Sequence, residues 1–365
     1  MALVQYALFF YALYFILREQ QRAYSPVFWM IVIALVVEYI ATASNPYGES
    51  HRFMIMMIQQ IGVWAFIDRS ISRKGKSFVR NYANVLMALV LVNFITVLLF
   101  PEGMYSAGAY SRNYFLGYDN THINIQLPAI AMMALSSEDN KREKKYYLLC
   151  VIVLISALIT FSATSVISLS VFVLGMIVIH FGKEKMFIKK ILFPKIYVSF
   201  CVFAGISFSI IAGTLLLSVG HFFVEVFHKD LTLSSRTLIW ANSLAYIEKS
   251  PIIGYGYELP DVINSQLVNI AGQVGWGGST HSFYLWILFL GGAVLMACVS
   301  IIILIINRQV EKGEANRPSQ IIKLWFLVVL MMGLVEAHYD SAFFLMLIVS
   351  YNISHNYNIS VLKTS

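Results

Sequence analysis

"YYLLCVIVLISALITFSATSVISLSVFVLGMIVIHF" (residues 146–181) contains no Lys, Arg, Asp or Glu. A membrane-spanning helix needs about 20 apolar residues, so this stretch is long enough for roughly two crossings. We expect the chain to turn at "SATS" (162–165), where small polar residues can form a tight loop. The stretch therefore predicts a pair of transmembrane helices.

Further apolar runs repeat this pattern along the 365 residues of the chain. Soluble domains carry about 25% charged residues, whereas this chain has 12% charged and 59% hydrophobic residues. We therefore predict an all-α integral membrane protein with about 11 transmembrane helices (roughly 10 to 12). The expected runs are 2–17, 27–43, 53–67, 83–100, 122–136, 146–161, 165–181, 196–218, 282–306, 322–337 and 341–353.

The basic residues indicate how these helices are oriented. All but five of the 26 Lys and Arg residues fall in loops that would share one side of the bilayer. The positive-inside rule makes that side cytoplasmic. The asymmetry explains the formal net charge of +7 without a nucleic-acid partner. The five basic residues on the other side are Arg52, Arg112, Lys229, Arg236 and Lys249.

This orientation divides the chain into three parts. Residues 1–218 are expected to form an N-terminal transmembrane bundle of about eight helices. Residues 219–281 form one large exterior loop with an amphipathic helix, and residues 282–365 form the C-terminal transmembrane helices and a cytoplasmic tail. "GYGYE" (254–258) lacks the Lys-Ser/Thr ending of a phosphate-binding loop, which argues against nucleotide binding. The three cysteines lie apart in apolar runs, so we expect neither a disulfide framework nor a metal site.

The amphipathic helix starts in "SSRTLIW". Ser234 or Ser235 can cap a helix that begins at Arg236, and Pro251 ends it. One face carries an apolar stripe, which we expect to lie on the membrane surface or against the transmembrane bundle. The stripe consists of Trp240, Leu244 and Ile247.

Arg236 and His281 are the side chains of this loop best suited to chemistry. A guanidinium stays charged and can hold two phosphate oxygens at once, which suits a diphosphate. A histidine can accept a proton from a hydroxyl near neutral pH. We expect Thr280 or Ser279 to cap the next helix and to place His281 in its first turn. The alternatives are that Arg236 pairs with a lipid head group or a loop carboxylate, and that His281 anchors a helix end.

Other polar residues are weaker candidates. The motif "EAHYD" places Glu336 and His338 where an apolar run meets the exterior, either to line a sugar site or as a solvated connector. Arg112 lies among aromatic residues, whose faces can stack on sugar rings or anchor the membrane. Glu38 is an intramembrane carboxylate and hence a functional suspect, although it lies near the outer end of its run and could reach water.

Two longer motifs carry a family resemblance. "LTLSSRTLIWANSLAYIEKSPIIGYGYE" (231–258), then a glycine-rich stretch and "THSFYLWILFLGG" (280–292), resembles the signature loop of the O-antigen polymerase and ligase family. In that family an Arg-x-x-x-Trp helix leads to a Pro-x-x-Gly-x-Gly turn, and a His-Ser or His-Asn pair then opens a helix with a glycine pair. "FLGYDNTHINIQLPAI" (115–130) also looks like the family's Gly-x-x-Asn segment. The matching residues are Arg236, Trp240, Pro251, Gly254, Gly256, His281, Ser282, Gly291, Gly292, Gly117 and Asn120.

The chain departs from the family at "TFSATS" (160–165). Many members have Thr-x-Ser-Arg at the end of a mid-chain span, and this sequence has no arginine there. Whether a second arginine acts is therefore left open, with Arg112 as a substitute.

The resemblance implies a glycosyltransferase that takes a glycan from an undecaprenyl-diphosphate carrier, with no nucleotide sugar, metal or cofactor. Arg236 would bind the diphosphate, and His281 would act as a base or orient the acceptor hydroxyl. Attack from the opposite face would invert the anomeric configuration. Substrate-binding roles are expected for Arg112, Asn120, His122, Trp240, Gly254, Gly256, Glu336 and His338.

The acceptor distinguishes two activities within this family. A polymerase uses another lipid-linked repeat unit, whereas a ligase uses a finished lipid or protein. Short loops and modest length favour a polymerase of capsular, exopolysaccharide or O-antigen repeats, acting at the outer face of a bacterial plasma membrane. Membrane lipids, a chain-length regulator and a flippase would be its partners. The alternative of another class is a lipid-linked oligosaccharide flippase, which would need a polar path through helices that carry almost no charge apart from Glu38.

Overall fold

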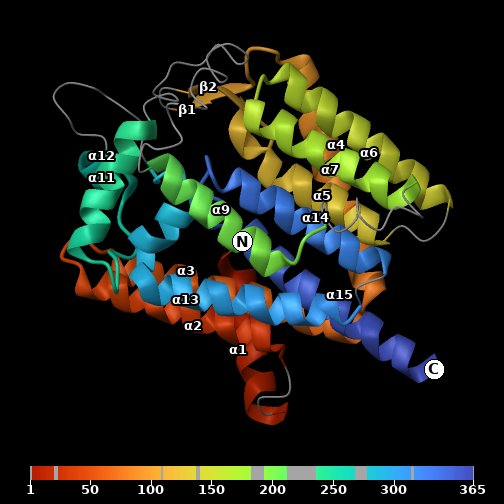
Figure 1. Cartoon of the computed structure of the whole chain (residues 1–365), viewed down its shortest axis with the longest axis horizontal. Helices are drawn as coiled ribbons and strands as arrows, with labels where there is room; N and C mark the ends of the chain where they lie inside the picture. The colour runs from red at the N-terminus through yellow and green to blue at the C-terminus, as the bar shows by residue number, and fades with distance from the viewer. Residues whose placement is uncertain are drawn as a thin grey trace. The chain divides into compact units, whose positions relative to one another are not determined.

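The computed structural model describes residues 2–19, 24–107, 110–136, 140–181, 193–211, 236–267, 278–313 and 316–364. Most of these residues are helical (Figure 1). The helices are α1 (Ala2–Glu19), α2 (Pro26–Ser44), α3 (Ser50–Lys74), α4 (Lys76–Leu99), α5 (Ile123–Ser136), α6 (Asn140–Ile159), α7 (Ala163–Phe181), α9 (Ile196–Ile211), α11 (Arg236–Lys249), α12 (Pro260–Leu267), α13 (Phe283–Glu311), α14 (Arg317–Met332) and α15 (Ser341–Thr364), with a 3-10 turn η2 (Asp119–Thr121).

The helices agree with the predicted apolar runs, each of which overlaps one of them. The opening stretch forms α6 and α7, separated by a turn at residues 160–162. Among the described residues, four helices are long and apolar enough to cross a membrane, namely α2, α4, α13 and the Ala163–His180 part of α7. A helical membrane protein is thus supported, whereas about 11 crossings stays a prediction.

The segment between α4 and α5 differs from the all-helical expectation. It contains a small antiparallel sheet of three strands in the order β1 (Tyr105–Ala107), β2 (Tyr110–Tyr114) and β3 (Gly117–Tyr118). Asn113 pairs with Tyr105 on one side and with Tyr118 on the other. The backbone N–H and C=O groups of these strands bond to one another, so the connection satisfies them without forming a helix.

The chain divides into two compact units. The first unit comprises Met1–Arg69, Ile196–Asn307 and Leu330–Phe344. The second unit comprises Ser70–Lys195, Arg308–Val329 and Leu345–Ser365, and it includes α4 to α7 and the sheet. Arg236, His281, Glu336 and His338 belong to the first unit.

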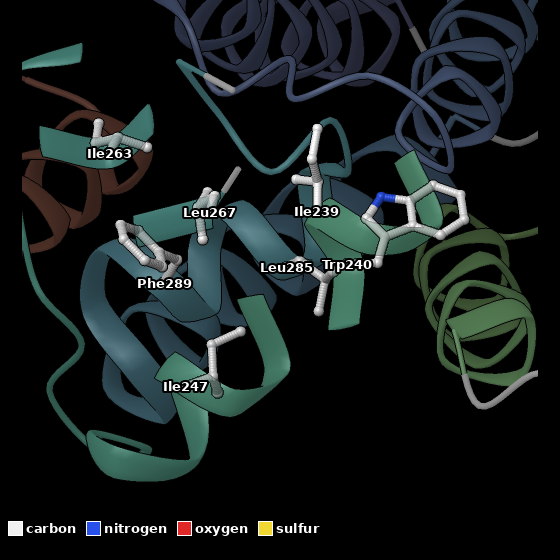
Figure 2. Packing of buried hydrophobic residues seen from close by; sticks show 7 residues of the cluster. All are labelled: Ile239, Trp240, Ile247, Ile263, Leu267, Leu285 and Phe289. Atoms are coloured by element: carbon white, nitrogen blue, oxygen red, sulfur yellow. The ribbon is translucent and has the colours of Figure 1, made fainter. Parts of the chain in front are cut away.

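In the first unit, α11 and α12 pack against the first half of α13 (Figure 2). The amphipathic helix α11 ends before Pro251, as predicted, while its expected caps lie outside the described residues. Its stripe is confirmed, because Trp240 is 2% exposed and Leu244 packs against the same cluster. The cluster consists of Ile239, Trp240 and Ile247 from α11, Ile263 and Leu267 from α12, and Leu285 and Phe289 from α13.

A break in α13 shapes the rest of this unit. The sequence predicted one uninterrupted span over 282–306, but Gly291 (φ −143°, ψ 16°) and Gly292 (φ 58°, ψ −155°) are non-helical. The helical hydrogen bonds across the break are replaced by bonds to the turn that follows α11. Tyr255 N donates to Phe289 O (2.8 Å), Gly256 N to Leu290 O (2.8 Å), Ala293 N to Pro251 O (2.8 Å) and Val294 N to Ile252 O (3.2 Å).

The glycines of the family motif allow this close contact. Gly254 (φ 73°) and Gly256 (φ 72°) adopt left-handed backbone conformations. A Cβ on Gly254 would lie 2.6 Å from Phe289 O, and one on Gly256 would collide with the backbone of Thr42 in α2. The turn is also bound to α2, because Tyr257 N donates to Thr42 Oγ1 (2.8 Å) and Asn45 Nδ2 donates to Tyr255 O (2.9 Å). The motif therefore joins α2 and both halves of α13.

We expect Gly292→Ala to destabilise the protein. A left-handed φ costs a residue with a Cβ about 1–2 kcal/mol, and this Cβ would also collide with the carbonyl of Ile252. Thermal unfolding of the purified protein should show a lower Tm. Gly205→Ala in α9 is the matched control, because a Cβ there has no neighbour within 4 Å. An unchanged Tm for Gly292→Ala would contradict this account of the break.

Candidate functional site

Arg236 and Glu336 form an ion pair across 100 residues of sequence. Nη2 of Arg236, the first residue of α11, donates to Oε1 of Glu336 at 2.8 Å. Glu336 lies between α14 and α15, and the two side chains are 21% and 19% exposed. The pair is thus partly shielded from water. A charged hydrogen bond is stronger in such a place than on an open surface.

His281 approaches the same carboxylate from the start of α13. Its Nδ1 lies 3.8 Å from Oε2 of Glu336, which is longer than a hydrogen bond but close enough for an ion pair once the imidazole is protonated. The His281 side chain is 29% exposed. Arg236 and His281, the two residues that the sequence singled out for chemistry, therefore meet at one carboxylate.

The backbone at His281 differs from the sequence-based expectation. His281 does not lie in the first turn of a helix, since α13 begins at Phe283 and His281 has φ 48°. Ser279 Oγ accepts from His281 N (3.3 Å), and Thr280 Oγ1 donates to Ser282 O (2.8 Å), so these side chains shape the approach to the helix. A left-handed residue with a Cβ costs about 1–3 kcal/mol and persists only where its surroundings hold it.

Ser282 and Gly333 supply much of this support. Ser282 Oγ lies 3.3 Å from Ser207 Oγ of α9 and 3.5 Å from the carbonyl oxygen of Gly333. The same carbonyl accepts from Phe283 N at 2.9 Å. A Cβ on Gly333 would lie 2.9 Å from Cβ of Phe283, so glycine allows the two segments to meet. These contacts fix the His281 segment to the segment that carries Glu336.

Glu336 is ionised at neutral pH. Burial favours the neutral acid, but the nearby His281, Arg236 and His338 outweigh it and lower the pKa of Glu336 from 4.5 to about 2. The carboxylate therefore keeps its charge, and with it the Arg236 pair, until the pH falls toward 2. The site at rest holds one guanidinium and one carboxylate.

His338 and Asp340 have separate roles in the same segment. His338 is 8% exposed, and burial lowers its pKa, with Asp340 and Glu336 opposing the shift and Arg236 adding to it. It is therefore largely neutral at pH 7. Asp340 Oδ1 accepts from Phe343 N at 2.9 Å and caps α15. Within "EAHYD", His338 is therefore buried, and the other four residues are partly exposed.

His122 lies in the second unit and is enclosed by protein. Its Nδ1 lies 3.3 Å from Nδ2 of Asn93 in α4, and its Nε2 lies 3.1 Å from the carbonyl oxygen of Gly117. The carbonyl requires Nε2 to carry the proton, so Nδ1 accepts from Asn93. Burial lowers the pKa of His122, although the Gly117 bond opposes the shift. His122 therefore links β3, through Gly117, to α4, through Asn93.

Asn120 and Arg112 also lie in the second unit. Asn120 Nδ2 donates to Tyr118 OH at 3.4 Å, and its side chain is exposed. Arg112 lies 3.9 Å from Glu102, whose side chain is 91% exposed, so the pair contributes little to stability. Their predicted substrate-binding roles stay predictions, as do those of Trp240, Gly254 and Gly256, which pack against α2 and α13 in the first unit.

Some of the residues that build this site were not predicted from the sequence. Ser207 and Gly333 were missed, although Gly333 stands just before "EAHYD", where a glycine signals a close approach. Thr42 and Asn45 at the end of α2 were missed as well. No group of three or more His, Cys, Asp or Glu side chains in the described part of the chain is arranged to hold a metal ion.

Comparison with known families covers the part of the chain that contains Arg236, the glycine turn and His281. Residues 148–300 match the family model described as O-Antigen ligase. This segment is similar to the O-antigen polymerase and ligase family. No curated protein and no solved structure matches the chain. The O-antigen ligase segment supports a membrane protein with a role in lipid-linked glycan processing.

We expect His338 to make the protein sensitive to mild acid. Its pKa is lowered in the folded state, so the unfolded chain binds a proton more readily. Stability is therefore lost as the pH falls below about 6.5, the unperturbed value. The fall in Tm between pH 7.5 and 5.5 should be smaller in His338→Asn than in the original protein. His51→Asn, at an exposed position in α3, is the control. Equal falls in His338→Asn and the original protein would refute the prediction.

Proposed function

We propose that this protein is a polysaccharide polymerase. It transfers a glycan from an undecaprenyl-diphosphate carrier onto a hydroxyl of another lipid-linked repeat unit, at the outer face of the plasma membrane. The observation that carries the proposal is the meeting of Arg236 and His281 at Glu336. Both residues come from the O-antigen ligase segment, whose family consists of glycosyltransferase-like enzymes.

The chemistry needs a cation and a base. The acceptor oxygen forms a bond to the anomeric carbon, the bond from that carbon to the diphosphate breaks, and the electron pair leaves with the diphosphate. Arg236 stabilises that departing charge. His281 takes the proton of the acceptor hydroxyl. A diphosphate is already a good leaving group, so it needs no general acid of the kind that glycoside hydrolysis uses, and attack from the face opposite the diphosphate inverts the anomeric configuration.

A ligase is the second candidate, and the family description favours it. Ligase and polymerase share the donor and differ in the acceptor. The short connecting segments of the chain favour the polymerase. In either case, residues 219–281 form the catalytic loop on the extracytoplasmic side, and Arg112 and Asn120 of the second unit are separate candidates for substrate contact.

Arg236→Ala and His281→Ala should each abolish polymerisation in cells. Each variant is expressed to the original level in the membrane, and the extracted glycans are separated on a gel. We expect single repeat units on the acceptor and no ladder, with a loss of about 100-fold or more in long chains. Lys249→Ala, which removes a cation from the far end of the same helix, should leave the ladder unchanged.

Other outcomes identify the alternatives. Long chains that accumulate on the lipid carrier without an acceptor would identify a ligase. Single units trapped on the inner leaflet would identify a flippase. Full ladders in both variants would show that Arg236 and His281 are not the site.

A further inference from the structure

We propose that Glu336 is a positioning residue that exchanges partners during the reaction. In the structure Glu336 is paired with Arg236, which is also the residue proposed to bind the donor's diphosphate. When the donor binds, Glu336 leaves Arg236 and orients His281. The proposal rests on the function proposed above and adds a competing anion to that site.

The geometry of the carboxylate is the first support. Each oxygen of Glu336 faces a different partner, with Oε1 at 2.8 Å from Arg236 Nη2 and Oε2 at 3.8 Å from His281 Nδ1. The bond to Arg236 is fully formed, whereas the approach to His281 is about 1 Å too long for a hydrogen bond. In the proposed exchange, a small rotation of the Glu336 side chain lengthens the first contact and shortens the second.

The charges of the site are the second support. Glu336 is anionic at neutral pH, and its charge offsets that of Arg236. His338 is largely neutral, because burial lowers its pKa. Asp340 is engaged as the cap of α15. A doubly charged diphosphate that approaches this site meets a guanidinium already paired with Glu336, so the diphosphate and the carboxylate compete for Arg236.

Proton transfer makes the exchange favourable. When the acceptor hydroxyl attacks, its proton moves to the ring nitrogen of His281 that does not face Glu336, Nε2. The imidazole becomes a cation, and the released Glu336 carboxylate stabilises it from the Nδ1 side. Glu336 itself gains no proton. When the lipid diphosphate leaves and His281 returns its proton to water, Glu336 pairs with Arg236 again.

The test measures binding and turnover separately in the purified full-length protein. Inorganic pyrophosphate is the binding probe, measured by calorimetry, and turnover is measured with a lipid-diphosphate-linked donor. Glu336→Gln should bind pyrophosphate about tenfold tighter, because Arg236 is no longer neutralised. The same variant should show a kcat lower by about tenfold or more, because His281 loses its carboxylate. A structural role alone would not change binding and kcat in opposite directions.

Glu248→Gln is the matched control. Glu248 is an exposed carboxylate on the same helix as Arg236, so the variant removes an equal charge without touching the site. It should change neither pyrophosphate binding nor kcat. Glu336→Asp keeps the charge but shortens its reach, and it should recover part of the lost kcat while binding pyrophosphate tighter than the original protein does.

The outcomes separate this proposal from the proposed function. If Arg236→Ala does not weaken pyrophosphate binding, the diphosphate role of Arg236 is wrong, and the exchange falls with it. If Arg236→Ala weakens binding but Glu336→Gln does not strengthen it, only the exchange is wrong. Should Glu336→Gln fail to fold, Glu336→Asp decides: unchanged or weaker pyrophosphate binding in a folded Glu336→Asp protein would overturn the exchange.

Discussion

The structure of the first unit depends on backbone hydrogen bonds exchanged between the turn 251–256 and the break in α13. Inside a membrane or a packed core, an unsatisfied carbonyl or amide costs several kcal/mol, so a broken helix is stable only where other protein groups replace the lost bonds. Here the amides of the turn donate to carbonyl groups before Gly291, and the carbonyl groups of the turn accept from amides after Gly292. The turn thereby ties α11, which carries Arg236, to the helix whose start follows His281.

A carboxylate organises the other side of the site. A partly buried charge needs partners, and Glu336 has Arg236 and His281 within ion-pair distance. The Ser207, Ser282 and Gly333 contacts hold the two segments together, so the left-handed backbone at His281 can persist. Four stretches of chain that are far apart in sequence, around Ser207, Arg236, His281 and Glu336, are therefore joined by one acidic side chain and the hydroxyl of Ser282.

The sequence predicted the positions of the helices better than the break in α13 and the sheet after α4. Hydrophobic periodicity located the helices because an apolar run of membrane length has few other solutions. The end of α11 before Pro251 was also predicted, since the effect of a proline on a helix is local. The break in α13 was not predicted, because "LGGA" within a hydrophobic run is also compatible with an unbroken helix. The sheet after α4 was missed for a similar reason, as its strands are too short for a clear alternation.

The sequence by itself indicated the helical membrane class, the family resemblance and the choice of Arg236 and His281 as candidate chemical groups. These properties follow from composition, local periodicity and motif spacing. Only the tertiary structure decided that Glu336 joins these two residues, that His338 is buried and that the glycine turn closes the break in α13. Those features depend on contacts between segments that are far apart in sequence. Such contacts are set by how the segments pack in space, so they leave no regular spacing along the chain.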